Sequence, residues 1–118
     1  MTEQNVERKR GRRIIKSETT KNKTITLYTI HFNSLYKNQI ELSSFVRWLI
    51  TNKQDVYLNL DMPTNKYEGN TEQTTISLYP DEYKHIDVKI IDSRNFSNFL
   101  KWGIDNFVEE YIKSESNK

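Results

Sequence analysis

The sequence of 118 residues contains no cysteine, only three glycines and only two prolines. Without cysteine, the chain has neither a disulfide framework nor thiolate ligands for a metal. The glycines are isolated at Gly11, Gly69 and Gly103, so none forms a loop that would hold a phosphate. No run approaches the roughly 20 apolar residues that span a membrane, and the charged N-terminus does not resemble a secretion signal. We therefore expect a cytoplasmic protein that does not associate with membranes.

Side chains suited to catalysis or metal binding are also scarce. His31 and His85 are the only histidines, and neither stands in the His-x-x-x-His or His-x-Glu spacing of a metal site. The acidic pairs Asp81-Glu82 and Glu109-Glu110 are more typical of helix ends than of an acid–base site. The sequence predicts no enzyme, no catalytic residue, no metal site and no cofactor.

Basic side chains are concentrated near the N-terminus. Residues 1–23 hold eight basic and three acidic side chains, a net charge of +5, whereas residues 24–118 have a net charge of −3. Because residues 1–22 lack hydrophobic periodicity, we expect a flexible basic arm there. Basic arms bind nucleic acid because each cation that meets a phosphate releases counterions; a solubilising tail is the alternative. The candidate arm contacts are Arg8, Lys9, Arg10, Arg12, Arg13 and Lys16.

The first half of the remaining chain, residues 23–53, reads as one strand followed by two helices. Alternation of polar and apolar residues over 24–28 predicts a half-buried strand. Helical spacing of apolar residues predicts a helix over 30–39, with Thr29 as its N-cap, and a second helix over 42–52. Pro, Gly and Asn then mark residues 54–73 as a connector, in which alternation also allows a short strand at 56–60.

The second half, residues 74–113, repeats this order and is followed by a tail at 114–118. A strand is predicted over 75–79, and Pro80 with two acids begins a helix whose apolar face continues to Ile90. A turn capped by Asn95 precedes a final helix from Phe96 to about Lys113.

The two halves share sequence as well as order. Residues 24–28 and 75–79 agree at four of five positions, and residues 43–50 match residues 97–104 at Ser, Phe, Trp and Ile, with Arg47 matched by Lys101. The offset is 51 at the strand and 54 at the second helix. Such a small unit cannot bury its own apolar face, so we expect the two strands to pair above the helices.

This repeated strand–helix–helix unit resembles the ribbon-helix-helix (MetJ/Arc-type) family of DNA-binding proteins over residues 23–52 and 74–112. The tandem form is similar to that of TraY-like conjugation proteins. The resemblance implies a mainly α fold with a two-stranded antiparallel β-ribbon, in which both units of one chain form an intramolecular pseudo-dimer. We accordingly expect a monomer, several copies of which are able to bind along one DNA.

The resemblance also implies how DNA is contacted, with the ribbon in the major groove. Since the apolar strand residues must face the helices, Thr24, Thr26, Thr75 and Ser77 face outward as candidate base readers. Lys23 and Gln73 extend this set. The alternation places Lys23 on the inner face, so its side chain would have to turn outward to reach DNA. Phosphates would meet the N-termini of the second helices, at Ser43 and Ser44 in one unit and at Arg94, Asn95, Phe96 and Ser97 in the other. The first unit departs from this pattern, because Glu41 stands at the position that Asn95 holds in the second unit.

Two functions from different classes follow as expectations. The first is sequence-specific binding of double-stranded DNA, as an accessory protein of a plasmid transfer origin or as a transcriptional repressor, with a relaxase or another DNA-processing protein as a further partner. Its target need not be palindromic, because a covalently joined ribbon need not be symmetric. The alternative is a protein-interaction module, antitoxin-like or a phage-encoded inhibitor, that uses the same scaffold.

Overall fold

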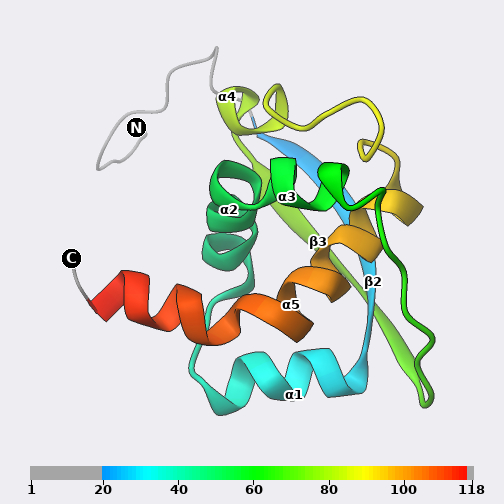
Figure 1. Cartoon of the computed structure of the whole chain (residues 1–118), viewed down its shortest axis with the longest axis vertical. Coiled ribbons are helices and arrows are strands. Elements are labelled where there is room, and N and C mark those ends of the chain that lie inside the picture. Colours follow the sequence, from blue (N-terminus) through cyan, green and yellow to red (C-terminus); the bar gives the residue numbers. More distant parts are fainter. Residues whose placement is uncertain (1–19, 117–118) are drawn as a thin grey trace, which may run out of the picture.

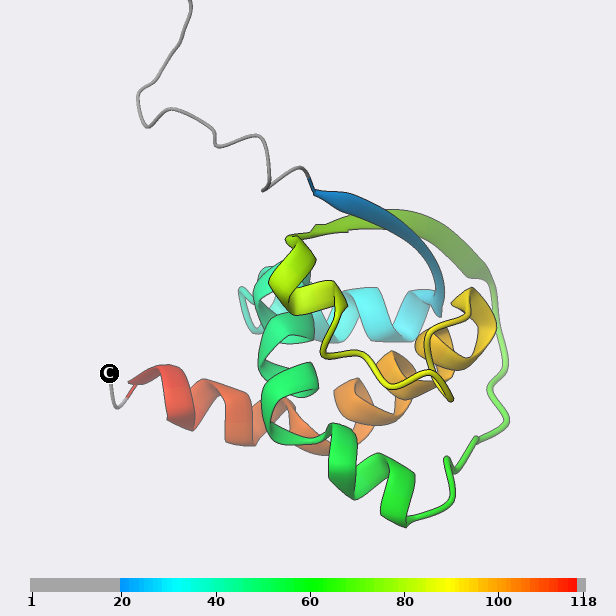
Figure 2. The ribbon, with the colours of Figure 1, turned by 90° about the horizontal axis from the view of Figure 1, so that it is seen from above.

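The computed structural model describes residues 20–116, which form a two-stranded ribbon with helices on one side of it (Figures 1 and 2). The prediction of a mainly α fold with a two-stranded antiparallel ribbon is confirmed. Within residues 20–116, no helix has the length and apolar character needed to cross a membrane. The elements in chain order are β2 (Lys21–Tyr28), α1 (Thr29–Lys37), α2 (Leu42–Asn52), α3 (Gln54–Asn59), β3 (Thr71–Leu78), α4 (Pro80–Tyr83) and α5 (Ser93–Ser116).

The ribbon pairs β2 with β3 in an antiparallel register that places Thr24 directly opposite Thr75. These two residues occupy matching positions of the sequence repeat. Opposite residues of an antiparallel pair share a face, and successive residues alternate between faces. The inner face therefore carries the apolar side chains, which are at most 3% exposed: Ile25, Leu27, Ile76 and Leu78.

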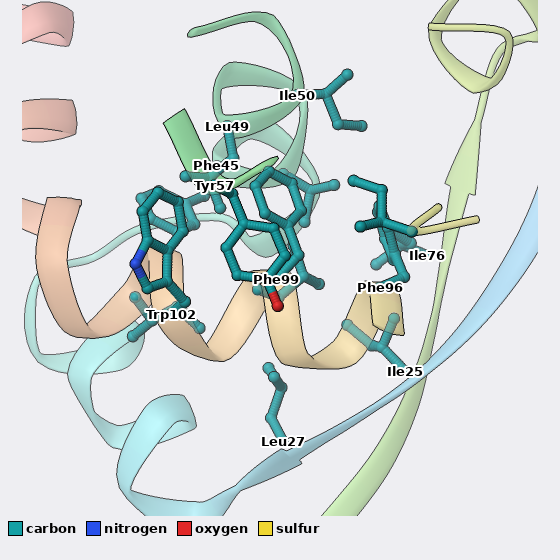
Figure 3. Packing of buried hydrophobic residues seen from close by; sticks show 14 of the residues in the cluster. Ile25, Leu27, Phe45, Leu49, Ile50, Tyr57, Ile76, Phe96, Phe99 and Trp102 are labelled. Atoms are coloured by element: carbon teal, nitrogen blue, oxygen red, sulfur yellow. The ribbon is translucent and has the colours of Figure 1, made fainter. Parts of the chain in front are cut away.

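The core lies between the ribbon and helices α2, α3 and α5. Aromatic rings fill much of it, as the close view shows for Phe45, Tyr57, Phe96, Phe99 and Trp102 (Figure 3). The rings of Tyr57 and Phe99 have centroids 5.1 Å apart, and those of Phe99 and Trp102 lie stacked with centroids 6.0 Å apart. Such contacts add to the area that each ring buries.

Helices α2 and α5 approach each other closely where Leu49 meets Gly103. A Cβ atom on Gly103 would lie 2.4 Å from Cδ1 of Leu49 and 2.7 Å from its Cδ2. The two residues are 54 apart and hold matching positions of the repeat. A side chain at position 103 would therefore force that of Leu49 to move.

The helix predicted to continue from Pro80 to Ile90 is wrong beyond Tyr83, where α4 ends. The buried side chain of Gln54 takes the backbone groups that a longer helix would use. Its Nε2 donates to the carbonyl oxygen of His85 at 2.8 Å, and its Oε1 accepts from the N–H of Asp87 at 2.7 Å. A residue from α3, distant in the sequence, thus holds this segment as turns.

Three smaller predictions also differ. The strand allowed at 56–60 is wrong, because residues 56–59 belong to the helix α3, which ends at Asn59. Helix α1 begins at Thr29 itself, so Tyr28 is its N-cap. Helix α5 begins three residues early, at Ser93, because the carboxylate of Asp92 accepts the N–H of Asn95 at 2.9 Å. Helix α2 has the bounds that its apolar spacing predicts.

Candidate functional site

The outer face of the ribbon is polar, and no helix of residues 20–116 covers it (Figure 2). The structure places Thr24, Thr26, Gln73, Thr75 and Ser77 on this face, as the alternation of the strands predicts. All of them are exposed except Thr26, which is half-buried. Their hydroxyl and amide groups form a continuous hydrogen-bonding surface along both strands.

Asn22 completes this surface and was not among the predicted readers. It lies opposite Ser77, whose hydroxyl donates to its Oδ1 at 2.8 Å. Extending the alternation by one more outward position would have found it. Asn22 matches Gln73 in the repeat, and Thr26 matches Ser77. Each half of the face therefore presents an amide, a threonine and a second hydroxyl in the same order.

Lys23 faces inward, so its expected part in base contact is wrong. Its side chain is 7% exposed and lies opposite Ile76 in the register. The ammonium donates to the carbonyl oxygen of Ile91 and lies 5.5 Å from the centroid of the Phe96 ring. Burial lowers the pKa of Lys23. The strand parity that it shares with Ile25 decides its position.

The N-terminus of α5 does not present the groups expected to bind phosphate. The N–H of Asn95 donates to the Asp92 carboxylate, and the N–H of Phe96 donates to the Asp92 carbonyl oxygen at 2.9 Å. The buried hydroxyl of Ser97 accepts the N–H of Thr26 at 3.0 Å. Asp92 also adds negative charge where an anion would otherwise be favoured. Of the four predicted residues, only Arg94 is exposed, and it remains a candidate contact.

The N-terminus of α2 has a carboxylate of its own. Glu41 is the N-cap residue, and its Oε1 accepts the hydroxyl of Ser44 at 2.8 Å. Ser43 and Ser44 are half-buried. The charge of Glu41 would repel a second anion at this helix end, so phosphate binding there is disfavoured.

A polar hollow of about 550 Å³ lies between β2, the chain before β3 and the first turns of α5. Two cations line it, Arg94 and Lys101, together with Thr24, Thr26 and Gln73 of the outer face. Lys101 was not predicted as a site residue, although its match to Arg47 in the repeat was a signal. Its ammonium lies 5.1 Å from the centroid of the Tyr28 ring, and burial lowers its pKa. The hollow thus extends the polar outer face to one side of the ribbon.

The basic arm, with Arg8, Lys9, Arg10, Arg12, Arg13 and Lys16, lies outside residues 20–116, so its contacts with DNA stay a prediction.

His31 is buried beside the hollow and joins three parts of the chain. Its Nδ1 accepts the N–H of Tyr28 at 3.2 Å, and its Nε2 lies 3.3 Å from Oδ1 of Asp105. Tyr67 donates its hydroxyl to Asp105; burial and this contact raise the pKa of Tyr67 to about 12, so the phenol keeps its proton. Burial lowers the pKa of His31, and the carboxylate of Asp105 opposes this shift while the charge of Lys101 adds to it.

We expect this histidine to make folding sensitive to mild acid. Its pKa is 6.5 when exposed and lower in the folded protein, so the unfolded chain binds more protons between these values. Between pH 7.5 and 5.5, the free energy of unfolding should fall as the pH is lowered, by at most about 1.4 kcal/mol per pH unit. Urea denaturation at pH 7.5, 6.5 and 5.5 measures this slope.

The matched variants for this experiment are His31→Gln and His85→Gln. A glutamine at position 31 retains an acceptor for the N–H of Tyr28 but does not titrate, so the slope should disappear. His85 is exposed, and its replacement should leave the slope unchanged. A His31→Gln protein with the wild-type slope would show that another group is responsible.

Among residues 20–116, no three His, Cys, Asp or Glu side chains lie close enough together to hold a metal ion. Comparisons of the chain with family models, with curated proteins and with solved structures found no match.

Proposed function

We propose that the protein binds double-stranded DNA by placing the outer face of its ribbon in the major groove. The observation that carries this proposal is the uncovered face of the ribbon, on which Asn22, Thr24, Thr26, Gln73, Thr75 and Ser77 present only polar groups to solvent. A two-stranded ribbon fits the width of the major groove, where each base pair offers a distinct pattern of donors and acceptors.

The side chains of this face suit base edges. An amide such as that of Asn22 or Gln73 can bond both N6 and N7 of adenine, while threonine can offer its methyl group to that of thymine. None of these side chains is charged, so phosphate contacts by the flanks and the arm must supply much of the affinity.

The proposal includes an intramolecular pseudo-dimer of two ribbon-helix-helix units. Support comes from the register, which sets the matching residues Thr24 and Thr75 opposite each other and distributes the same chemistry to both halves of the face. These observations favour a target with two related half-sites over the non-palindromic target that a single chain also allows. In this proposal, the protein acts at a plasmid transfer origin beside a relaxase, or as a repressor.

Selection from a pool of random duplexes, followed by titration of the selected DNA over a salt series, tests the proposal. Wild-type protein should bind with an affinity that falls steeply with salt. Replacing Thr24, Thr26, Thr75 and Ser77 together by alanine should lower the preference for the selected site over unrelated DNA by about tenfold or more, or ~1.4 kcal/mol. Circular dichroism checks that the variant is folded.

Replacing Thr51 and Asn59 by alanine provides a control, because both are exposed and lie outside the ribbon. This variant should keep the full preference. Absence of binding to any duplex at low salt would reject the proposal and favour the protein-interaction module. Equal preference in the quadruple variant and the wild type would show that the outer face does not read bases.

A further inference from the structure

The first flank of the ribbon is the side of α2 and α4, and the second flank is the side of α5. The two flanks are matched in sequence but differ in charge. Arg47 of α2 and Lys101 of α5 hold matching positions of the repeat. On the first flank, Nε of Arg47 lies 2.7 Å from Oε2 of Glu82, so its charge is paired within the protein. Glu82 also accepts the N–H of Tyr79 through its other oxygen, at 2.8 Å, and is thereby held in place.

On the second flank, the residue that matches Glu82 is His31. It accepts the N–H of Tyr28 as Glu82 accepts that of Tyr79, but it supplies no negative charge to a neighbouring cation. The nearby carboxylate of Asp105 is directed to His31 and Tyr67. Within residues 20–116, Lys101 therefore has no acidic partner, although its side chain is half-buried. A half-buried cation without an anion is costly, and an anionic ligand would offset that cost.

The hollow beside Lys101 offers space and further donors for such a ligand. Arg94 and Asn98 also line it, and Arg94 has no ion pair within residues 20–116. The position that matches Arg94 on the other flank is Ile40, which has no charge. An ammonium and a guanidinium beside a polar hollow are suited to a phosphate group.

We propose that this hollow binds one phosphate of the DNA backbone, through Lys101 and Arg94, on one flank of the ribbon only. The inference rests on the proposed function and deepens it. The base-reading face is nearly the same in its two halves, whereas the phosphate contact, here called the one-sided grip, lies on the second flank only. The duplex is therefore held more tightly on the α5 side, and a nearly symmetric reading surface acquires a preferred orientation.

Three variants test this proposal through the salt dependence of DNA binding. Each phosphate contact contributes about 0.9 to the slope of log affinity against log salt. Lys101→Gln should therefore reduce the slope by about one and weaken binding several-fold. The matched control is the double variant Arg47→Gln/Glu82→Gln, which removes an internally paired cation and should leave the slope unchanged.

The third variant, Glu82→Gln, should gain affinity. Glutamine keeps an oxygen for the N–H of Tyr79 but releases the charge of Arg47, so the first flank gains a free cation. The slope should become steeper by about one, and an unchanged slope would overturn the claim that Glu82 keeps Arg47 from the DNA backbone. Thermal denaturation of each variant separates loss of the fold from loss of the contact.

Several results would overturn the proposal. An unchanged slope in Lys101→Gln would exclude the contact, and equal losses in Lys101→Gln and the double control would exclude a one-sided grip. Calorimetric titration with inorganic pyrophosphate tests whether the hollow instead binds a free phosphate compound. Tight binding of pyrophosphate that duplex DNA does not displace would assign the hollow to a small anion. Wild-type protein that binds no duplex would reject the proposed function itself, whereas loss of the one-sided effect alone would leave that function standing.

Discussion

Replacing Gly103 by leucine is expected to lower the free energy of unfolding by about 2 kcal/mol or more. A Cβ atom alone would lie within 2.4 Å of Leu49, which is fully buried, and leucine adds three further carbons. Overpacking of a core costs about 1–3 kcal/mol or more, and better helix propensity than glycine returns at most ~1 kcal/mol. Urea denaturation followed by tryptophan fluorescence measures the loss.

The companion variant Leu49→Gly gives this prediction its sharpest form. Alone it should cost about 4 kcal/mol, because it leaves a cavity and puts glycine in a helix. When both changes are combined, the large and small residues exchange places. The double variant should then be more stable than Leu49→Gly alone, even though it contains a second destabilising change. Simple addition of the two losses would mean that the residues do not share one space.

The second large effect is expected from Thr75→Glu. Thr75 lies at the centre of the outer face, exposed and opposite Thr24, so a carboxylate there would enter the groove among base acceptors and phosphates. Juxtaposed like charges cost several kcal/mol at an interface. DNA affinity should fall by at least about 100-fold, which corresponds to ~2.7 kcal/mol. Titration of the selected duplex by fluorescence anisotropy measures it.

Asn59→Glu provides the control for this variant. It makes the same change in net charge on α3, which lies across the helical layer from the ribbon (Figure 2). Its effect on affinity should be small, because exposed charges farther apart than a Debye length are screened. Equal losses in the two variants would point to net charge, rather than the ribbon, as the determinant of binding.

Structural features that depend on the residues of a single element could be predicted best from the sequence. The alternation over residues 24–28 and 75–78 assigns each residue to the correct face, and it also gives the inward position of Lys23, which contradicts the base contact expected of that residue. The apolar spacing of α2 gives its bounds because its buried face runs the whole length of the helix.

The predictions that were wrong or missing concern contacts between residues distant in the sequence, or a choice between competing local hydrogen bonds. Helix α4 stops at Tyr83 because the side chain of Gln54 bonds the backbone that follows, and no local pattern reveals that contact. Asp92 and Asn95 are both good capping residues, so only their hydrogen bonds decide between them. The hollow beside Lys101 requires β2, α5 and the chain before β3 to be placed together, which the spacing of residues cannot supply.

The contact of Leu49 with Gly103 also bears on the pseudo-dimer proposed above. In a symmetric dimer, matching positions that touch across the axis hold the same residue, so leucine would meet leucine and glycine would meet glycine. A large residue against a small one therefore requires two copies that differ in sequence, as the halves of this chain do. In the pseudo-dimer proposed above, this contact therefore distinguishes the pairing of the two different halves from a pairing of identical ones.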